Sequence, residues 1–152
     1  MTDASPLGAI LSTEPSIFGE AAARDAARRF WGIEGRFTSL TSERDVNWRI
    51  ETGVENFVLK LANPAESAEV TDFQIKALLH LEPARLPVPR VVRTLDGETE
   101  ASVPEGRLRL LTYLEGEMLF RAEPSAPLRR SVARMNAALT AALAGFAHPA
   151  AG

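Results

Sequence analysis

The chain of 152 residues carries a formal net charge of −3 at neutral pH and contains no cysteine. Its length fits one ordinary domain, and the absence of cysteine excludes disulfide scaffolds, thiolate zinc sites and cysteine nucleophiles. The acidic balance, a start without a basic segment, and the absence of an apolar run of roughly 20 residues predict a cytoplasmic protein that binds neither nucleic acid nor membrane.

The first predicted element is a helix that follows a mobile leader. Residues 1–16 are small, polar and proline-containing, which is typical of a poorly ordered terminus. Ser16 is expected to cap a helix from Phe18 to Trp31, which Gly32 ends. Its apolar stripe has helical spacing and consists of Ala23, Ala26, Ala27 and Phe30.

Three short segments rich in β-branched and aromatic residues then predict strands at residues 35–40, 46–51 and 56–61. A second helix is expected over residues 65–81, with a stripe of Val70, Gln74, Ala77, Leu78 and Leu81. The prolines that follow it impose an extended segment. Two more strands are predicted at residues 90–95 and 107–113.

A third helix is expected from Ser125, its cap, to about residue 144. Its apolar face comprises Leu128, Val132, Met135, Leu139, Leu143 and Phe146. The whole order is helix, three strands, helix, two strands, helix. Short hairpins with one inserted helix predict an α+β fold with a five-stranded antiparallel sheet.

Lys60 is the residue with the most specific chemistry. The basic residues comprise fifteen arginines and only two lysines, Lys60 and Lys76, and Lys60 lies inside a predicted strand. An ammonium there must reach solvent or meet an anion, because an unpaired buried charge is costly. A surface position on a strand edge would also account for Lys60. The two histidines, His80 and His148, have no metal-site spacing, so no metal site is expected in this chain.

Four runs carry a resemblance to a known family: LTSERDVNWRI (residues 40–50), FVLKL (57–61), LPVPRV (86–91) and RLLTYLEG (109–116). In this order and spacing they resemble the N-terminal lobe of the aminoglycoside phosphotransferase family, small-molecule kinases with a protein-kinase-like fold. The resemblance is strongest to the hydroxylysine kinase-like branch and to phosphotransferase domains fused to class III aminotransferases. It implies an N lobe over residues 17–114, in which one helix packs on the sheet. Residues 115–152 would form the hinge exit and the first helix of an incomplete C lobe.

The resemblance also implies roles for individual residues. Residues 40–47, with Ser42 and Asn47, would form the loop over the nucleotide phosphates, and Lys60 would pair the α- and β-phosphates. The helix partner of that lysine would be Gln74, Asp72 or Glu69, and the sequence leaves the choice among the three open. The hinge would be Thr112, Tyr113 and Leu114, with the Thr112 carbonyl and the Leu114 N–H bonding the purine edge.

The printed sequence contains no HGD motif followed by Asn and no metal-binding Asp of this family, which belong to the C-terminal lobe. The resemblance therefore implies the nucleotide-binding part of a small-molecule O-phosphotransferase that is inactive alone. The complete enzyme would use Mg²⁺ with ATP or GTP and an amino-alcohol acceptor such as hydroxylysine. Two alternatives stay open, a noncatalytic pseudokinase-like interaction module and an inert remnant. Self-association through the last helix is expected if its apolar face is exposed.

Overall fold

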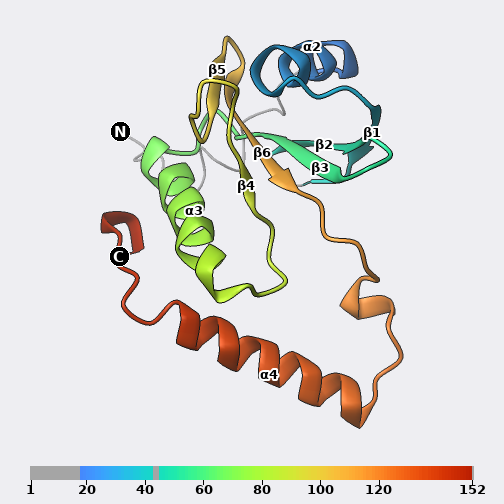
Figure 1. The fold of residues 1–152 in the computed structure, drawn as a ribbon, viewed down its shortest axis with the longest axis vertical. Coiled ribbons are helices and arrows are strands. Elements are labelled where there is room, and N and C mark those ends of the chain that lie inside the picture. The colour runs from blue at the N-terminus through green and yellow to red at the C-terminus, as the bar shows by residue number, and fades with distance from the viewer. Residues whose placement is uncertain (1–17, 43–44, 152) are drawn as a thin grey trace, which may run out of the picture.

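The computed structural model describes residues 18–42 and 45–151. A β-sheet with a helix on each face comes first, and a further helix follows it (Figure 1). Residues 1–17, which include the expected leader and Ser16, lie outside the described residues. The helices are α2 (Glu20–Trp31), α3 (Ala68–Leu81) and α4 (Ala126–Ala142), and short 3-10 turns span Glu82–Ala84, Leu119–Arg121 and Pro149–Ala151. The strands are β1 (Arg36–Leu40), β2 (Val46–Glu51), β3 (Asn56–Leu61), β4 (Val91–Val92), β5 (Ala101–Val103) and β6 (Gly106–Thr112).

The strands form one antiparallel sheet in the order β1-β2-β3-β6-β4, and β5 also pairs with β6. The predicted α+β class and antiparallel sheet are confirmed, with six strands in place of five. The additional strand, β5, has three residues and forms a hairpin with β6. The expected strand at residues 90–95 shrinks to Val91–Val92, because the chain turns back at Thr94, whose carbonyl accepts from the Gly97 N–H.

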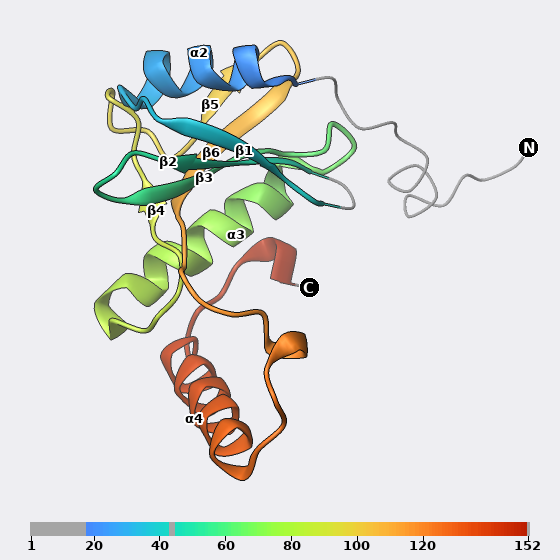
Figure 2. The same ribbon diagram turned by 90° about the vertical axis from the view of Figure 1, so that its right-hand side faces the viewer.

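The two faces of the sheet have different chemistry. Phe57, Leu59 and Leu61 of β3 are buried in the hydrophobic core on the side of α2. Since side chains alternate along a strand, Lys60 projects from the opposite face. In Figure 2, α2 lies above the sheet and α3 below it. Lys60 therefore projects from the face toward which α3 packs.

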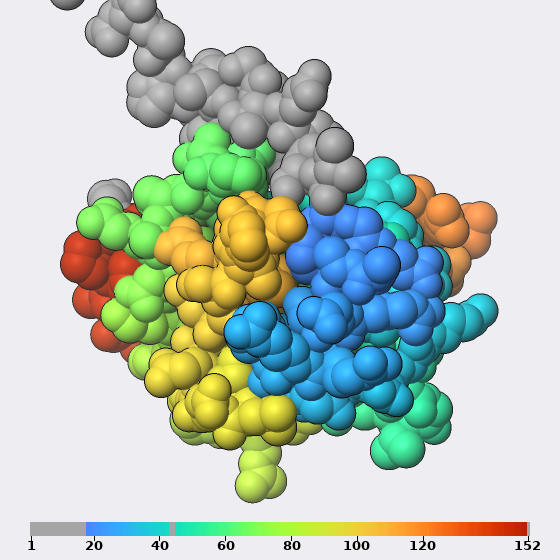
Figure 3. Space-filling view, turned by 90° about the horizontal axis from the view of Figure 1, so that it is seen from above, coloured from blue at the N-terminus to red at the C-terminus, as the bar shows by residue number. Residues whose placement is uncertain are grey.

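Helix α2 packs closely on the sheet because its inner stripe is mostly alanine. Ala23 and Ala27 are fully buried, and Trp31 anchors the end of the helix by donating from its indole nitrogen to the Val92 carbonyl. Gly19 takes the N-cap position without a side-chain hydrogen bond, so the helix begins at Glu20, two residues later than expected. The space-filling view from above shows α2 beside the hairpin of β5 and β6, and together they cover this side of the sheet (Figure 3).

Helix α3 begins later than predicted and turns a different face to the sheet. Ser67 is its N-cap and accepts from the Val70 N–H, so residues 65–67 are not helical. Its buried residues are Thr71, Ile75 and Leu81. Leu81 belongs to the expected stripe, but Thr71 and Ile75 take the buried positions that were expected for Val70 and Gln74. The buried Thr71 hydroxyl accepts a hydrogen bond from Arg107 of β6. This polar contact lets a threonine occupy a position that hydrophobic periodicity assigns to an apolar residue.

Helix α4 stands apart from the sheet (Figure 2). Ser125 caps it as expected, and it ends at Ala142, two residues early. None of its residues is buried, and the apolar face expected from the sequence is only half-buried. No helix among the described residues is both long enough and apolar enough to cross a membrane.

The segment that follows α4 returns to α3 and is held there by both histidines of the chain. His80 Nε2 lies 3.0 Å from the Ala142 carbonyl oxygen, and the His80 ring stacks against Phe146. His148 is almost fully buried; its Nδ1 accepts from the Ala150 N–H, which leaves Nε2 to donate to Asp72 at 3.0 Å. These contacts tie the C-terminal segment to α3.

The Asp72 contact makes the attachment of this segment sensitive to acid. Hydrogen bonds from Lys76 and then His148 hold the pKa of Asp72 below its usual value, against a smaller opposing effect of burial. The carboxylate therefore stabilises the attachment above the unfolded-state pKa of about 3.9, and the stabilisation is lost as the pH falls further through the lowered folded-state pKa.

As the pH falls from about 5 to about 3, we expect amide exchange of residues 146–151 to increase more in the wild type than in Asp72→Asn, because only the wild type has a carboxylate to lose. The measurement is hydrogen exchange of the wild type and Asp72→Asn at matched pH, corrected for intrinsic rates. Glu69→Gln, an exposed change on the same helix, is the control and should follow the wild type. Equal pH dependence in the wild type and Asp72→Asn would contradict the assignment.

Candidate functional site

Lys60 forms an ion pair with Asp45, which lies in the loop between β1 and β2. The Lys60 Nζ and Asp45 Oδ2 atoms are 3.3 Å apart, and the two side chains are 23% and 17% exposed. Asp45, which belongs to the segment expected to cover phosphates, therefore lies beside the lysine. Its Ser42 is exposed, and residues 43–44 lie outside the described part of the chain.

Asp45 is held from three directions. Its Oδ1 accepts from the Asn63 backbone N–H at 3.3 Å, directly after β3. Its Oδ2 faces Lys60 and also lies 3.8 Å from Nη2 of Arg109 on β6. The Asp45 carboxylate thus forms ion pairs with two cations on the neighbouring strands β3 and β6.

Arg109 is a residue of the candidate site that sequence reasoning missed. It lies directly opposite Lys60 in the β3–β6 register and is only 4% exposed. Burial lowers the pKa of Arg109, while the carboxylates of Asp45, Glu66 and Glu100 oppose that effect. Because the guanidinium stays protonated in proteins, Arg109 remains a buried cation. The alternation of arginine and leucine over residues 107–110 is the signal that places it on the face of Lys60.

Several polar groups on this face have no protein partner for one of their atoms. Asn47 lies opposite Lys60 in the β2–β3 register, and Arg49 is two residues further along the same face. Asn47 Oδ1, Arg49 Nε and Arg109 Nε are buried, and none has a hydrogen-bond partner within the described structure. We call Asn47, Arg49, Lys60 and Arg109 the cation face. Buried polar atoms without a protein partner are uncommon, and a water or a ligand can bond them.

The expected hinge leaves the sheet in a fixed conformation. The Thr112 N–H donates to the Arg90 carbonyl, and the Thr112 hydroxyl accepts from the Arg90 N–H, both at 2.9 Å. The Tyr113 N–H donates to the Asn56 carbonyl, and the Tyr113 ring lies 4.3 Å from the Arg49 guanidinium carbon. Leu114 is exposed.

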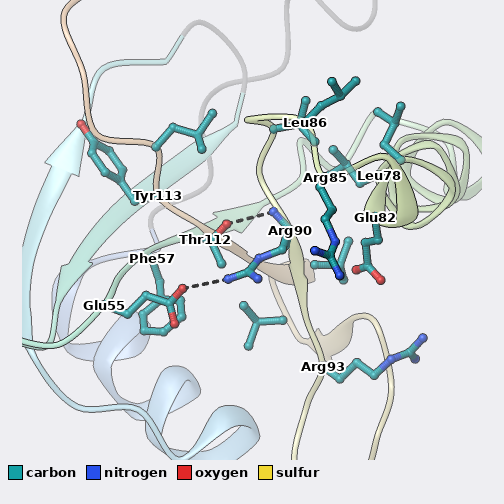
Figure 4. A pocket seen from close by; sticks show the side chains of 15 residues that line it. Glu55, Phe57, Leu78, Glu82, Arg85, Leu86, Arg90, Arg93, Thr112 and Tyr113 are labelled. Atoms are coloured by element: carbon teal, nitrogen blue, oxygen red, sulfur yellow. Dashed lines mark hydrogen bonds and ion pairs between the residues drawn. The ribbon is translucent and has the colours of Figure 1, made fainter. Parts of the chain in front are cut away.

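A cavity of about 980 Å³ opens beside the hinge (Figure 4). Thr112, Tyr113 and Leu114 line it, together with Leu78 and Leu81 from the end of α3. Arg90 crosses it and pairs with Glu55, as the dashed lines in Figure 4 show. Lys60 does not line this cavity, so the hinge and the cation face are separate parts of the site.

The structure records no ion pair or hydrogen bond between Lys60 and the three helix residues expected opposite it, all of which are described. Asp72 forms an ion pair with Lys76, at 2.7 Å, and accepts a hydrogen bond from His148. Gln74 is half-buried, and Glu69 is exposed. Lys60 takes its carboxylate from Asp45 instead of α3, because α3 begins at Ala68 and turns Thr71 and Ile75 toward the sheet. Over residues 18–42 and 45–151, no three acidic or histidine side chains gather into a metal site.

Comparisons with known proteins agree with the fold described above. The sequence model of the phosphotransferase enzyme family matches residues 36–152. A spectinomycin phosphotransferase solved with ADP and spectinomycin is 7% identical, with a TM-score of 0.61 over 76% of this chain and 35% of its own. An amicoumacin kinase solved with AMP-PNP and Ca²⁺ is 14% identical, with a TM-score of 0.55 over 66% of this chain and 32% of its own.

A microcompartment-associated aminopropanol kinase is 17% identical, with a TM-score of 0.59 over 87% of this chain and 43% of its own. The chain therefore spans less than half the length of these structures. At such low sequence identity, the structural similarity shows the fold alone. No curated protein matches the sequence significantly. Because the family match covers more than half of its residues, the chain belongs to the phosphotransferase enzyme family.

Proposed function

We propose that this chain is the nucleotide-binding part of a small-molecule O-phosphotransferase that uses ATP or GTP. The cation face is the observation that carries the proposal. It presents Lys60 with two arginines and an amide, while Asp45 is the one carboxylate paired with Lys60 among the described residues. Such a face suits a polyphosphate, since charge-assisted hydrogen bonds to phosphate are stronger than neutral ones.

The groups of the cation face suit this ligand. Arg49 Nε is an unpartnered donor, the Asn47 amide carries an NH₂ donor, and the buried Arg109 contributes its positive charge. We propose that Lys60 contacts the α- and β-phosphates, and that Ser42 and Asn47 lie along the phosphate chain. The nucleotide would supply the terminal phosphoryl group that the complete enzyme transfers.

The purine would lie at the hinge, with the Thr112 carbonyl and the Leu114 N–H as its partners. Support comes from the conformation of this segment, which Arg49, Asn56 and Arg90 hold in place. Two of the similar structures were solved with ADP and with AMP-PNP, which favours an adenine nucleotide. The 980 Å³ cavity adjoins the hinge and leaves room on that side.

Among the described residues no three acidic or histidine side chains lie together, so we propose that a metal accompanying the nucleotide takes further ligands from outside them. An amino alcohol such as hydroxylysine remains our proposed acceptor class, and one structural relative is named an aminopropanol kinase. A cytoplasmic location also stays a proposal.

We expect residues 1–152 to transfer no phosphoryl group on their own. Phosphoryl transfer needs a carboxylate that orients the acceptor hydroxyl and ligands that place the metal, and each contributes orders of magnitude to the rate. The measurement is incubation of the purified chain with Mg²⁺, labelled ATP or GTP, and hydroxylysine or an aminoglycoside. Metal-dependent phosphorylation of either acceptor above a chain-free control would contradict this expectation.

Lys60→Ala should weaken nucleotide binding while the fold remains intact. Hinge hydrogen bonds contribute about 0.5–1.5 kcal/mol each and a charge-assisted phosphate contact about 1.5–3. Against the entropic cost of association, this sum predicts a dissociation constant near the millimolar range for the wild type. The measurement is NMR titration with ATP and GTP.

Lys76→Ala is the matched control, because Lys76 is the other lysine and pairs with Asp72 at the surface of α3. It should bind nucleotide like the wild type. The proposed role of Lys60 fails if the wild type shows no shifts near Lys60 and Thr112, or if Lys60→Ala and Lys76→Ala bind equally.

The second candidate function is an interaction module without catalysis, and the apolar face of α4 favours it. Leu128, Val132, Leu139 and Leu143 are only half-buried, and Met118, Leu119 and Phe120 before the helix are exposed. Each large apolar group contributes roughly 1.5–3 kcal/mol when fully buried, so this face gains from a covering partner.

We expect the isolated chain to self-associate through α4 at high concentration, or to show rapid amide exchange there. Val132→Asp places a charge on the apolar face and should reduce association, whereas Ser131→Asp on the exposed side should not. Sedimentation and hydrogen exchange are the measurements. A monomer at high concentration with a well-protected α4 would rule out an unsatisfied surface on this helix.

A further inference from the structure

Lys60 and Arg109 form an unusual pair, because two like charges lie directly opposite each other on adjacent strands. Such pairs are destabilising unless a counter-charge lies between them. Asp45 provides it with a single oxygen: Oδ2 lies 3.3 Å from Lys60 Nζ and 3.8 Å from Arg109 Nη2. The three groups form one unit with a net positive charge.

The two cations differ in their freedom to meet a ligand. The Lys60 side chain is 23% exposed and ends in an ammonium on a flexible stem, whereas the Arg109 side chain is 5% exposed. Arg107, two residues earlier on the same face, is fixed to Thr71 of α3. Only Lys60 of the pair can therefore turn toward an incoming anion, while Arg109 stays beside Asp45.

We infer that Arg109 is a positioning residue that holds Asp45 in place while Lys60 turns from the carboxylate to a phosphate. This inference rests on the proposed function of the cation face. In the free chain Asp45 is shared by the two cations. In the bound chain Lys60 contacts the phosphate, and Asp45 keeps Arg109 and the Asn63 N–H as its partners.

The physical reason lies in the burial of Asp45. Its side chain is only 17% exposed, and separation of a partly buried ion pair leaves a charge without a partner, which is costly. With Arg109 present, Lys60 leaves a carboxylate that remains paired. Without Arg109, Lys60 would be the only cation paired with Asp45 among the described residues, and the phosphate would have to compete with the carboxylate for Lys60.

The first test compares ATP binding by Arg109→Met and Arg107→Met. A lost ion pair of partly buried groups predicts a rise in the dissociation constant of about fivefold for Arg109→Met and less than about twofold for Arg107→Met. Arg109→Lys, which keeps a cation at this position, should recover part of the affinity. Equal weakening by Arg109→Met and Arg107→Met would overturn the inference.

The second test uses no nucleotide and relies on the two lysines of the chain. The rate at which an amine-acetylating reagent labels Lys60 is measured relative to Lys76 by mass spectrometry. In Arg109→Met, Asp45 is no longer shared with a second cation, so Lys60 is held more tightly and should be labelled about threefold more slowly. In Asp45→Asn, Lys60 loses its partner and should be labelled about threefold faster. Arg107→Met should leave the ratio unchanged.

Arg109→Gln is the second variant if Arg109→Met does not fold, because it removes the charge but retains hydrogen-bonding groups; the same slowing is expected. Unchanged or faster labelling in a folded Arg109 variant without the charge would overturn the inference. If the labelling follows the expected pattern but the wild type binds no nucleotide, the proposed function fails and the shared carboxylate is supported. If nucleotide binds and the labelling does not respond, the role of Arg109 fails alone.

Discussion

The alternation of side chains along β3 is the constraint on which the site depends. Phe57, Leu59 and Leu61 are drawn into the core against α2, and a strand cannot bury these three residues without turning Lys60 to the other face. A slip of one residue would bury the ammonium and expose the leucines. Core formation and placement of the lysine are therefore the same event, and the register then sets Asn47 and Arg109 beside it.

Much of this arrangement was predictable from local patterns. Strands with β-branched residues, the Ser125 cap and the apolar stripe of α4 all follow short-range rules, and the structure has them close to where the sequence placed them. The family resemblance added the assignment to a phosphotransferase family, which the match to residues 36–152 confirms. The hinge segment and Lys60 were predicted as site residues because each lies within such a pattern.

The remainder depended on long-range pairing. Strand β5 was missed because three residues carry too little periodicity, and it forms only through its hairpin with β6. The face of α3 was shifted because Arg107 gives the buried Thr71 a hydrogen bond, which hydrophobic spacing does not reveal. Asp45 was placed in the correct loop but not identified as the partner of Lys60, since that choice depends on how the loop folds back on β3.

Arg49 gives the site a mechanical property. Its guanidinium bonds Glu115, contacts the Tyr113 ring and stems from β2, the strand that also carries Asn47. The direction in which the chain leaves the sheet is thus linked through Arg49 to β2. A shift of residues 113–115 would therefore also displace the side chain of Arg49, one member of the cation face.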